Sequence, residues 1–265
     1  MSWLKQHSLA AYFILAFTCS WLIWGLMIVS AQRIVSIPFN WWLLGAFGPL
    51  AAALIITGGR AGVRELVERM FRWRVGIRWI LITLLGPIAL FALAVAILRF
   101  SSGVWPDISR HMAYPEFGWV GAWFLFALLA LGEESGWRGF ALPRLQARRS
   151  ALSASLILGV LWVLWHLPIF WFHPGMMQIM QMGAVAAIIW IIGILTMSVL
   201  FTWLYNSARG SILMVALAHG GLNNVTLGGV EQTAGMVSAF VLVVAIITII
   251  IFRPANLSRS SRQIA

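Results

Sequence analysis

The sequence predicts an all-α membrane protein, a polytopic bundle of about eight transmembrane helices with both termini in the cytoplasm. Three observations support this fold class. Of the 265 residues, 62% are hydrophobic and 9% are charged, whereas charged residues make up about a quarter of a soluble domain. The hydrophobic residues form runs long enough to cross a bilayer as helices, and the lysines and arginines collect in alternate turns between these runs. A soluble globular chain is therefore excluded.

Eight apolar runs reach or approach the roughly 17 to 25 residues that a helix needs to cross about 30 Å of hydrocarbon. They lie near residues 9–30, 40–57, 79–98, 118–137, 152–171, 183–205, 211–228 and 235–252. The first run follows Lys5, as the apolar part of a signal peptide would, but it is longer than such a part and has no clear cleavage site. We therefore expect this run to be a retained first span.

The basic residues set the orientation of the predicted bundle. With the amino terminus inside, fourteen of the 18 lysines and arginines fall on the inner side, as the positive-inside rule requires. These are Lys5, Arg60, Arg64, Arg69, Arg72, Arg74, Arg78, Arg144, Arg148, Arg149, Arg209, Arg253, Arg259 and Arg262. This bias accounts for the net charge of +11, so we expect no nucleic-acid partner. It favours a location in the plasma (inner) membrane, surrounded by the lipid bilayer.

Three regions are predicted along the chain. Residues 1–117 hold the first three spans and end in an outer loop. Within them, residues 60–78 carry six arginines and apolar residues at helical spacing, which is typical of an amphipathic helix on an anionic inner leaflet or of a solvated turn that sets topology. Residues 118–228 form the functional core. Residues 229–265 hold the last span and a basic cytoplasmic tail that we expect to be disordered.

The stretch Gly132–Phe140 places charges at the end of an uncharged run. It contains Glu133, Glu134 and Arg138. Ionised side chains within membrane spans are costly, so they usually pair with one another or mark a site. Glu134 and Arg138 are four residues apart and therefore neighbours on one helix face, and this pair could be purely structural. Glu133 lies off that face and is the carboxylate left over for chemistry.

Two later spans contribute further titratable groups. His166 lies in the fifth run, whereas His219 and Asn223 lie one turn apart in the seventh and share a helix face. If the fourth and fifth runs form an antiparallel hairpin that turns near Arg149, residues whose numbers add to about 300 lie at the same depth. Glu133 and His166 satisfy this condition. All these groups are therefore expected to meet in a pocket that opens to the cytoplasm.

The same groups allow two kinds of chemistry. A carboxylate and imidazoles around a water suit hydrolysis, with the Asn223 amide as a donor to the developing oxyanion. Glu133, His166 and His219 would also make a three-ligand zinc site with an open fourth position, and spacing does not decide between the two. The single cysteine, Cys19, excludes a thiolate metal cluster. Each histidine also has a purely structural interpretation, as a partner for a backbone carbonyl or for another helix.

These residues resemble the motifs of the CPBP family of intramembrane proteases, which includes the type II CAAX prenyl endopeptidases and the bacteriocin-processing or immunity proteins of the Abi domain. The family's EExxxR motif, its FxxxH motif and its later histidine and asparagine are matched in chain order by Glu133, Glu134, Arg138, Trp162, His166, His219 and Asn223. Trp162 replaces the phenylalanine of FxxxH and keeps an aromatic ring there. The resemblance covers roughly residues 118–228.

The resemblance implies an endopeptidase whose active site faces the cytoplasm and whose substrate is a membrane-associated peptide or protein. The roles that it implies are water activation (Glu133 and His166), oxyanion stabilisation (His219 and Asn223) and support of the arrangement (Glu134 and Arg138). A water activated by glutamate needs no metal, so we favour a site without a cofactor and keep zinc as the alternative. Nothing in the sequence indicates that the substrate is prenylated.

Two other function classes are consistent with the sequence. The polar cluster could belong to a non-catalytic membrane scaffold or bacteriocin-immunity protein that binds a partner such as a sensor kinase. Buried carboxylates and histidines also relay protons in transporters, but the two halves of the chain show no repeated pair of Gly- or Pro-broken spans, which is the usual sign of a transporter site. An endopeptidase is therefore the favoured function.

Overall fold

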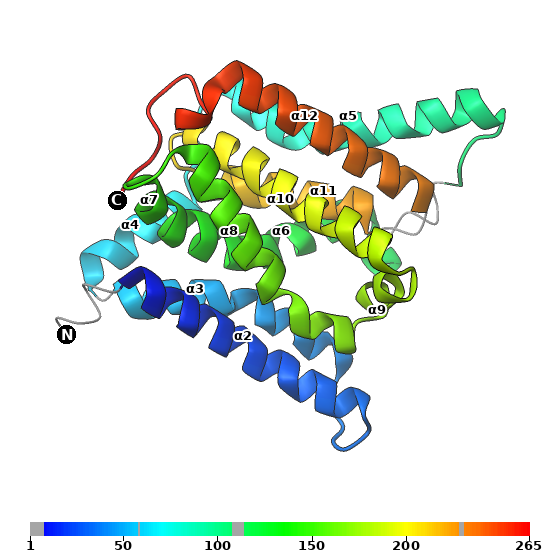
Figure 1. Cartoon of the computed structure of the whole chain (residues 1–265), viewed down its shortest axis with the longest axis horizontal. Coiled ribbons are helices and arrows are strands. Elements are labelled where there is room, and N and C mark those ends of the chain that lie inside the picture. Colours follow the sequence, from blue (N-terminus) through cyan, green and yellow to red (C-terminus); the bar gives the residue numbers. More distant parts are fainter. Residues whose placement is uncertain (1–7, 58, 108–113, 228–230) are drawn as a thin grey trace.

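The computed structural model describes residues 8–57, 59–107, 114–227 and 231–265, which form a bundle of helices without a β-strand (Figure 1). Among these residues, seven helical segments are long and apolar enough to cross a membrane. They are Ser8–Ala31, Phe39–Thr57, Ile77–Ser102, Pro115–Gln146, Ala151–Trp171, Ala184–Ser207 and Thr233–Asn256. The predicted all-α membrane bundle is confirmed, whereas the side of the membrane that each terminus faces stays a prediction.

Most helices begin and end within a few residues of the predicted apolar runs, because the need to cross hydrocarbon fixes both the length and the composition of a span. In chain order the elements are α2 (Ser8–Ala31), η1 (Phe39–Phe47), α3 (Gly48–Thr57), α4 (Arg60–Met70), α5 (Ile77–Ser102), η3 (Pro115–Phe117), α6 (Gly118–Gly136), η4 (Trp137–Ala141), α7 (Leu142–Gln146), α8 (Ala151–Trp165), η5 (Leu167–Trp171), α9 (Pro174–Gln181), α10 (Ala184–Ser207), α11 (Ile212–Thr226) and α12 (Glu231–Asn256).

The run predicted as a span at 211–228 is a shorter helix, α11, so the structure departs here from the predicted count of about eight. It has 15 residues, or about 22 Å of helix, which is less than the roughly 30 Å of a hydrocarbon core. Ser211 starts it by accepting a hydrogen bond from the Met214 N–H at 3.2 Å. Most of its residues are buried, and it packs against α5, α6, α10 and α12. α11 is therefore a core helix enclosed by protein.

Two glycines let the central helices approach one another closely. A Cβ added to Gly136 would lie 2.5 Å from the Pro49 carbonyl oxygen on α3, and one added to Gly220 would lie 2.7 Å from the Ala127 Cα on α6. Any larger residue would have to push these backbones apart. α6 is thus held directly between α3 and α11, which places residues 133–138 near the middle of the bundle.

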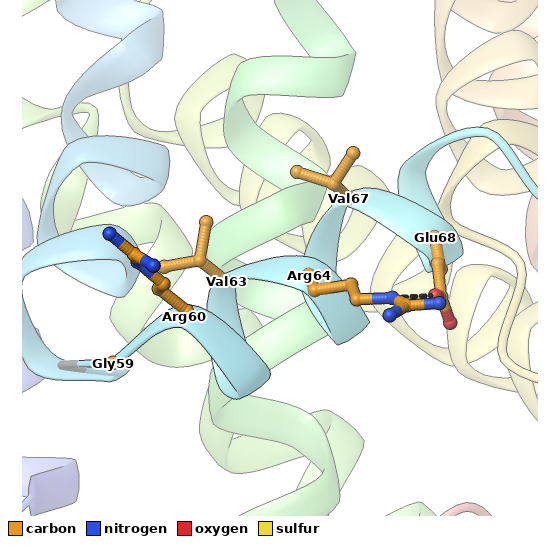
Figure 2. A pocket seen from close by; sticks show the side chains of 6 residues that line it. All are labelled: Gly59, Arg60, Val63, Arg64, Val67 and Glu68. Carbon is orange, nitrogen blue, oxygen red and sulfur yellow. Dashed lines mark hydrogen bonds and ion pairs between the residues drawn. The ribbon is translucent and has the colours of Figure 1, made fainter.

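The predicted amphipathic segment at 60–78 is helical only in its first part. α4 ends at Met70, and a turn leads from there to the start of α5. α4 buries Leu66, which lies where a side chain on Gly139 would be, while Arg60 and Arg64 are exposed and Arg69 is partly buried. A surface hollow of about 750 Å³ runs along α4 (Figure 2), lined by Gly59, Arg60, Val63, Arg64, Val67 and Glu68. None of the candidate site residues lines this hollow.

The carboxyl-terminal tail is packed against the bundle, so the expectation that it is disordered was wrong. After a break in α12 at Arg253 (φ 64°), the chain folds back onto the ends of α7 and α10. Gln146 and Asn206 are buried there and join their amides at 3.1 and 2.8 Å. Gln263 completes this network, accepting from Gln146 Nε2 at 2.7 Å and donating its N–H to Asn206 Oδ1 at 3.1 Å. Buried amides need such hydrogen-bond partners. The composition of the tail alone does not show that the tail supplies them.

Candidate active site

Two charges predicted to pair, Glu134 on α6 and Arg138 in η4, are buried at the centre of the bundle and both 0% exposed. Arg138 Nη1 donates to Glu134 Oε1 at 3.1 Å and lies 3.0 Å from Oε2. His219 on α11 donates from Nδ1 to the same Oε1 at 2.9 Å. Glu134 therefore contacts a cation on its own helix and an imidazole on another helix. A buried carboxylate needs such partners because no water is available to solvate its charge.

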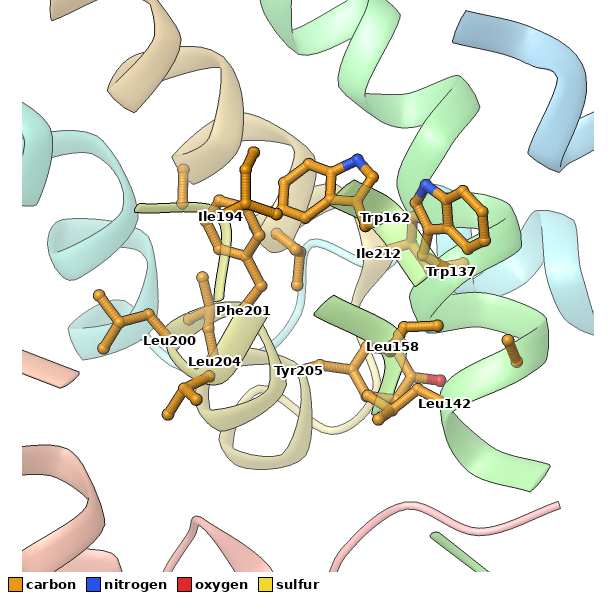
Figure 3. Close-up of a cluster of buried hydrophobic side chains, with 14 of the residues drawn as sticks. Trp137, Leu142, Leu158, Trp162, Ile194, Leu200, Phe201, Leu204, Tyr205 and Ile212 are labelled. Carbon is orange, nitrogen blue, oxygen red and sulfur yellow. The ribbon is translucent and has the colours of Figure 1, made fainter. Parts of the chain in front are cut away.

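Arg138 extends this network to two further helices. Its Nη2 donates to the Ser198 hydroxyl on α10 at 3.1 Å, and Ser198 in turn donates to the Ser155 carbonyl on α8 at 2.8 Å. The guanidinium also lies over the rings of Trp162 and Phe201, 5.1 and 5.3 Å from their centroids, and Figure 3 shows these two rings in the buried cluster. Cation–π contacts of this kind stabilise a desolvated cation. Arg138 thus fixes α6, α8 and α10 to one another.

Glu133 lies beside this network and has a different partner. It is 8% exposed, and its Oε2 accepts a hydrogen bond from Trp162 Nε1 on α8 at 2.9 Å. The carboxylate is also close enough to interact electrostatically with His219, Glu134 and Arg138. The described residues make no hydrogen bond to its other oxygen, Oε1. Arg138 therefore pairs with Glu134, and Glu133 keeps an oxygen for another group.

Trp162 is the residue whose part in the site the sequence analysis missed. It was noted only as an aromatic replacement for phenylalanine, but its indole N–H is a donor that phenylalanine lacks, and this donor contacts Glu133. Its backbone carbonyl accepts a hydrogen bond from His166 Nδ1 at 2.7 Å. One residue thus contacts both motifs. The sequence feature that could have indicated this contact is tryptophan in place of the motif's phenylalanine, because the indole adds an N–H donor to an otherwise apolar helix.

His166 ends α8 and is partly exposed at the edge of the cluster. Because a carbonyl oxygen can only accept, the contact with Trp162 puts the proton on Nδ1 and the lone pair on Nε2. Three indole rings surround the imidazole at centroid distances of 5.7, 4.8 and 5.7 Å, those of Trp162, Trp165 and Trp190. His166 interacts electrostatically with His219, but within the described ranges no hydrogen bond or ion pair joins it to either carboxylate.

Asn223 lies one turn beyond His219 on the same face of α11 and is partly exposed. Its neighbour Asn224 is 1% exposed and donates from Nδ2 to the Trp119 carbonyl at 3.2 Å. Of the two asparagines, Asn224 ties α11 to α6. Asn223 is therefore the asparagine that shares the helix face of His219.

The helix that carries both glutamates continues past Pro143. α6 runs into α7 through η4, a five-residue π-turn from Trp137 to Ala141. Proline has no N–H to donate to the carbonyl four residues earlier, and the wider turn directly before it accommodates this loss. Such π-turns are rare in proteins overall, but many of those that occur lie at functional sites. Arg138 lies within this turn, and the helix continues beyond it through α7 to Gln146.

The zinc ligands considered from the sequence do not form a set in this arrangement. Among the described residues, no group of three or more His, Cys, Asp or Glu side chains is placed to hold a metal ion. Glu133 Oε2 and His219 Nδ1 each face a hydrogen-bond partner, and so does His166 Nδ1. We therefore derive no step through a metal, and metal dependence stays a prediction to be tested.

Comparison with known proteins agrees with the motifs. Residues 115–225 match the family described as "Type II CAAX prenyl endopeptidase Rce1-like". A curated relative, "CAAX prenyl protease 2" of Methanococcus maripaludis, is 31% identical over 131 residues, which is 49% of this chain and 48% of the relative. The chain thus matches about half the length of that relative, and the range 115–225 matched by the family contains all of the motif residues. Residues 115–225 of this chain are therefore similar to the Rce1-like type II CAAX prenyl endopeptidases.

Proposed function

We propose that this protein is an intramembrane endopeptidase that hydrolyses a peptide bond of a membrane-associated peptide or protein. The observation that supports this most directly is the environment of Glu133. The Trp162 N–H holds one oxygen of its carboxylate, and no described residue forms a hydrogen bond with the other, which lies next to the network of Glu134, Arg138 and His219. A carboxylate placed in this way suits a general base, since it can bind and deprotonate a water.

In the proposed reaction, Glu133 takes a proton from a water while the water oxygen attacks the scissile carbonyl carbon. The carbonyl oxygen becomes an oxyanion, which accepts hydrogen bonds from His219 and the Asn223 amide. When the C–N bond breaks, protonated Glu133 gives its proton to the leaving amine. His166, whose Nε2 carries a lone pair, is proposed to orient the water from the other side.

Glu134 and Arg138 are proposed to support this chemistry without touching the substrate. Glu134 holds the Nδ1 of His219, so that the other ring nitrogen is directed to the oxyanion. To donate to Glu134 and to the oxyanion at the same time, His219 would carry a proton on both ring nitrogens. Arg138 fixes the Glu134 carboxylate in place. Hydrolysis would therefore depend on both residues, through the orientation of His219.

We also propose that the site is open to the cytoplasm at the plasma membrane. The arginine-rich helix α4 packs through Leu66 against Gly139, next to Arg138, so the basic end of the bundle and the site adjoin. Basic turns face the cytoplasm under the positive-inside rule. The relative's name suggests a CAAX sequence with a prenylated cysteine as the first substrate to try.

The test uses the purified protein in lipid nanodiscs and a fluorogenic peptide with a farnesylated cysteine followed by three residues, beside the same peptide without the lipid. We expect the wild type to cleave at least one of them and Glu133→Gln to lose activity. Glu116→Gln is the matched control, because Glu116 is an exposed glutamate in η3. If neither peptide is cleaved, membrane peptides from cells that produce wild type or Glu133→Gln are compared. Identical peptide patterns would reject the endopeptidase and favour a non-catalytic scaffold.

A further inference from the structure

Tyr12 on α2 lies against the segment that carries the glutamates, and its hydroxyl group has no hydrogen-bond partner in the described part of the chain. The residue is 0% exposed. Its ring stacks on Phe140 at a centroid distance of 4.8 Å and meets the edge of Trp137 at 6.0 Å. The hydroxyl oxygen sits beside Gly136, where an added Cβ would overlap it. No hydrogen bond from the described residues reaches this oxygen.

Two charged residues next to Tyr12 also have unfilled hydrogen-bonding capacity. Glu134 Oε2 and Arg138 Nε are buried and make no hydrogen bond among the described residues, although the two side chains form an ion pair. The Tyr12 hydroxyl interacts electrostatically with both of them. A hydroxyl can donate one hydrogen bond and accept another. A single Tyr12 hydroxyl therefore matches both deficits, as a donor to Glu134 and an acceptor from Arg138.

Packing alone does not account for this hydroxyl. Phenylalanine would fill the same space between Phe140 and Trp137 without burying an O–H group, and an unpaired buried polar atom destabilises a fold. Tyr205 is a second buried tyrosine, and its hydroxyl does have a partner. It is also 0% exposed, and its hydroxyl accepts a hydrogen bond from Arg69 Nη1 at 2.7 Å.

We propose that Tyr12 is a positioning residue of the hydrolytic site, and that its hydroxyl completes the hydrogen bonds of the Glu134–Arg138 pair, directly or through one water. This inference rests on the proposed function. Tyr12 acts by fixing the Glu134 carboxylate, whose other oxygen holds His219. It does not touch the substrate. The first helix, which lies outside the segment matched by the family, then contributes to the site.

The first test measures kinetics of Tyr12→Phe in nanodiscs with the farnesylated peptide. We expect kcat to fall about tenfold, the size of one hydrogen bond to a charged group, and KM to stay within about twofold. Thr83→Val is the matched control, because Thr83 on α5 is also 1% exposed with an unpartnered hydroxyl. It should leave both constants unchanged. An unchanged kcat in Tyr12→Phe, with Glu133→Gln inactive, overturns this inference and leaves the proposed function standing.

The second test does not depend on activity. Melting temperatures are measured for Tyr12→Phe, Glu134→Gln and the double variant. If the hydroxyl acts through Glu134, Tyr12→Phe lowers the melting temperature of the wild type by more than that of Glu134→Gln. Melting-temperature shifts of the two substitutions that simply add in the double variant overturn the inference. This test remains valid even if Glu133→Gln keeps its activity and the proposed function has failed. In the kinetic test, Tyr12→Phe should likewise have a smaller effect on kcat in the Glu134→Gln background.

Discussion

The Trp162 indole N–H and the Glu133 carboxylate meet at 2.9 Å, from α8 to α6. This contact joins the two motifs that the sequence places 29 residues apart. Trp162 also lies under the Arg138 guanidinium and bonds His166 through its carbonyl. Its ring and its N–H therefore have separate roles that two substitutions can distinguish.

Trp162→Phe keeps an aromatic ring but removes the indole N–H donor together with one of the two fused rings. We expect kcat to fall by about tenfold to a hundredfold, because the lost hydrogen bond goes to a charged group, and the stability to fall by less than the loss of the whole side chain would cause. Trp162→Ala also removes a fully buried ring and should destabilise the fold by about 3 to 5 kcal/mol. Peptide cleavage and unfolding in detergent would be measured for both variants. Equal losses in the two would show that the N–H has no separate role.

Breaking the Glu134–Arg138 pair should destabilise the protein strongly. Glu134→Gln and Arg138→Gln each leave one buried charge without its partner, which costs about 3 to 5 kcal/mol. The double variant should recover part of this loss. Glu68→Gln is the control, since Glu68 forms an exposed ion pair with Arg64 at 2.8 Å and such pairs contribute about 0.5 kcal/mol. Unfolding free energies in detergent check these values, and equal effects at Glu134 and Glu68 would contradict the network.

Gly136→Ala should disturb the packing of α6 against α3. The added methyl group would meet the Pro49 carbonyl oxygen at 2.5 Å, and relieving such a contact costs about 1 to 3 kcal/mol. Gly193→Ala on α10 makes the same chemical change at a position with no neighbour within 4 Å of the new Cβ. It should be neutral or stabilise by up to about 1 kcal/mol. Melting temperatures of both variants decide this, and a stable Gly136→Ala would argue against the close approach.

Metal dependence is tested by chelation. Because the candidate ligands do not form a three-ligand set in the described residues, we expect peptide cleavage to survive a strong chelator. We also expect purified protein to contain well under one zinc per chain by elemental analysis. Activity that is lost on chelation and restored by zinc would instead establish the alternative site of Glu133, His166 and His219.

The spans were predictable because hydrocarbon imposes a minimum length on every helix that crosses it. The relation between Glu134 and Arg138 was predictable for a similar reason, since four residues bring two side chains together on any α-helix. The contact of Glu133 with Trp162 was not, because it depends on how two helices are rotated against each other. Nor was the role of Ser198, a single small polar residue within an apolar run.

The tail and α11 show two further limits of the sequence. A polar, basic composition predicts disorder, but it does not reveal that Gln146 and Asn206 are buried and need backbone partners. The apolar run at 211–228 had the composition of a span, whereas its helix is too short to be one. In both cases the missing information lies in the neighbouring elements.

The π-turn at Trp137–Ala141 has a consequence for the register of the long helix that contains it. It holds one residue more than an α-helical turn, so each residue after it takes the place that an unbroken helix would give to the residue before, about 100° away around the axis. Gln146 meets Asn206 in this shifted register. Deleting Gly139 should therefore remove the extra residue, turn the segment into an ordinary α-helix and leave Gln146 in phase with Asn206, so that the carboxyl-terminal residues stay resistant to protease. The π-turn is then an inserted residue that the fold absorbs without moving the helix beyond it.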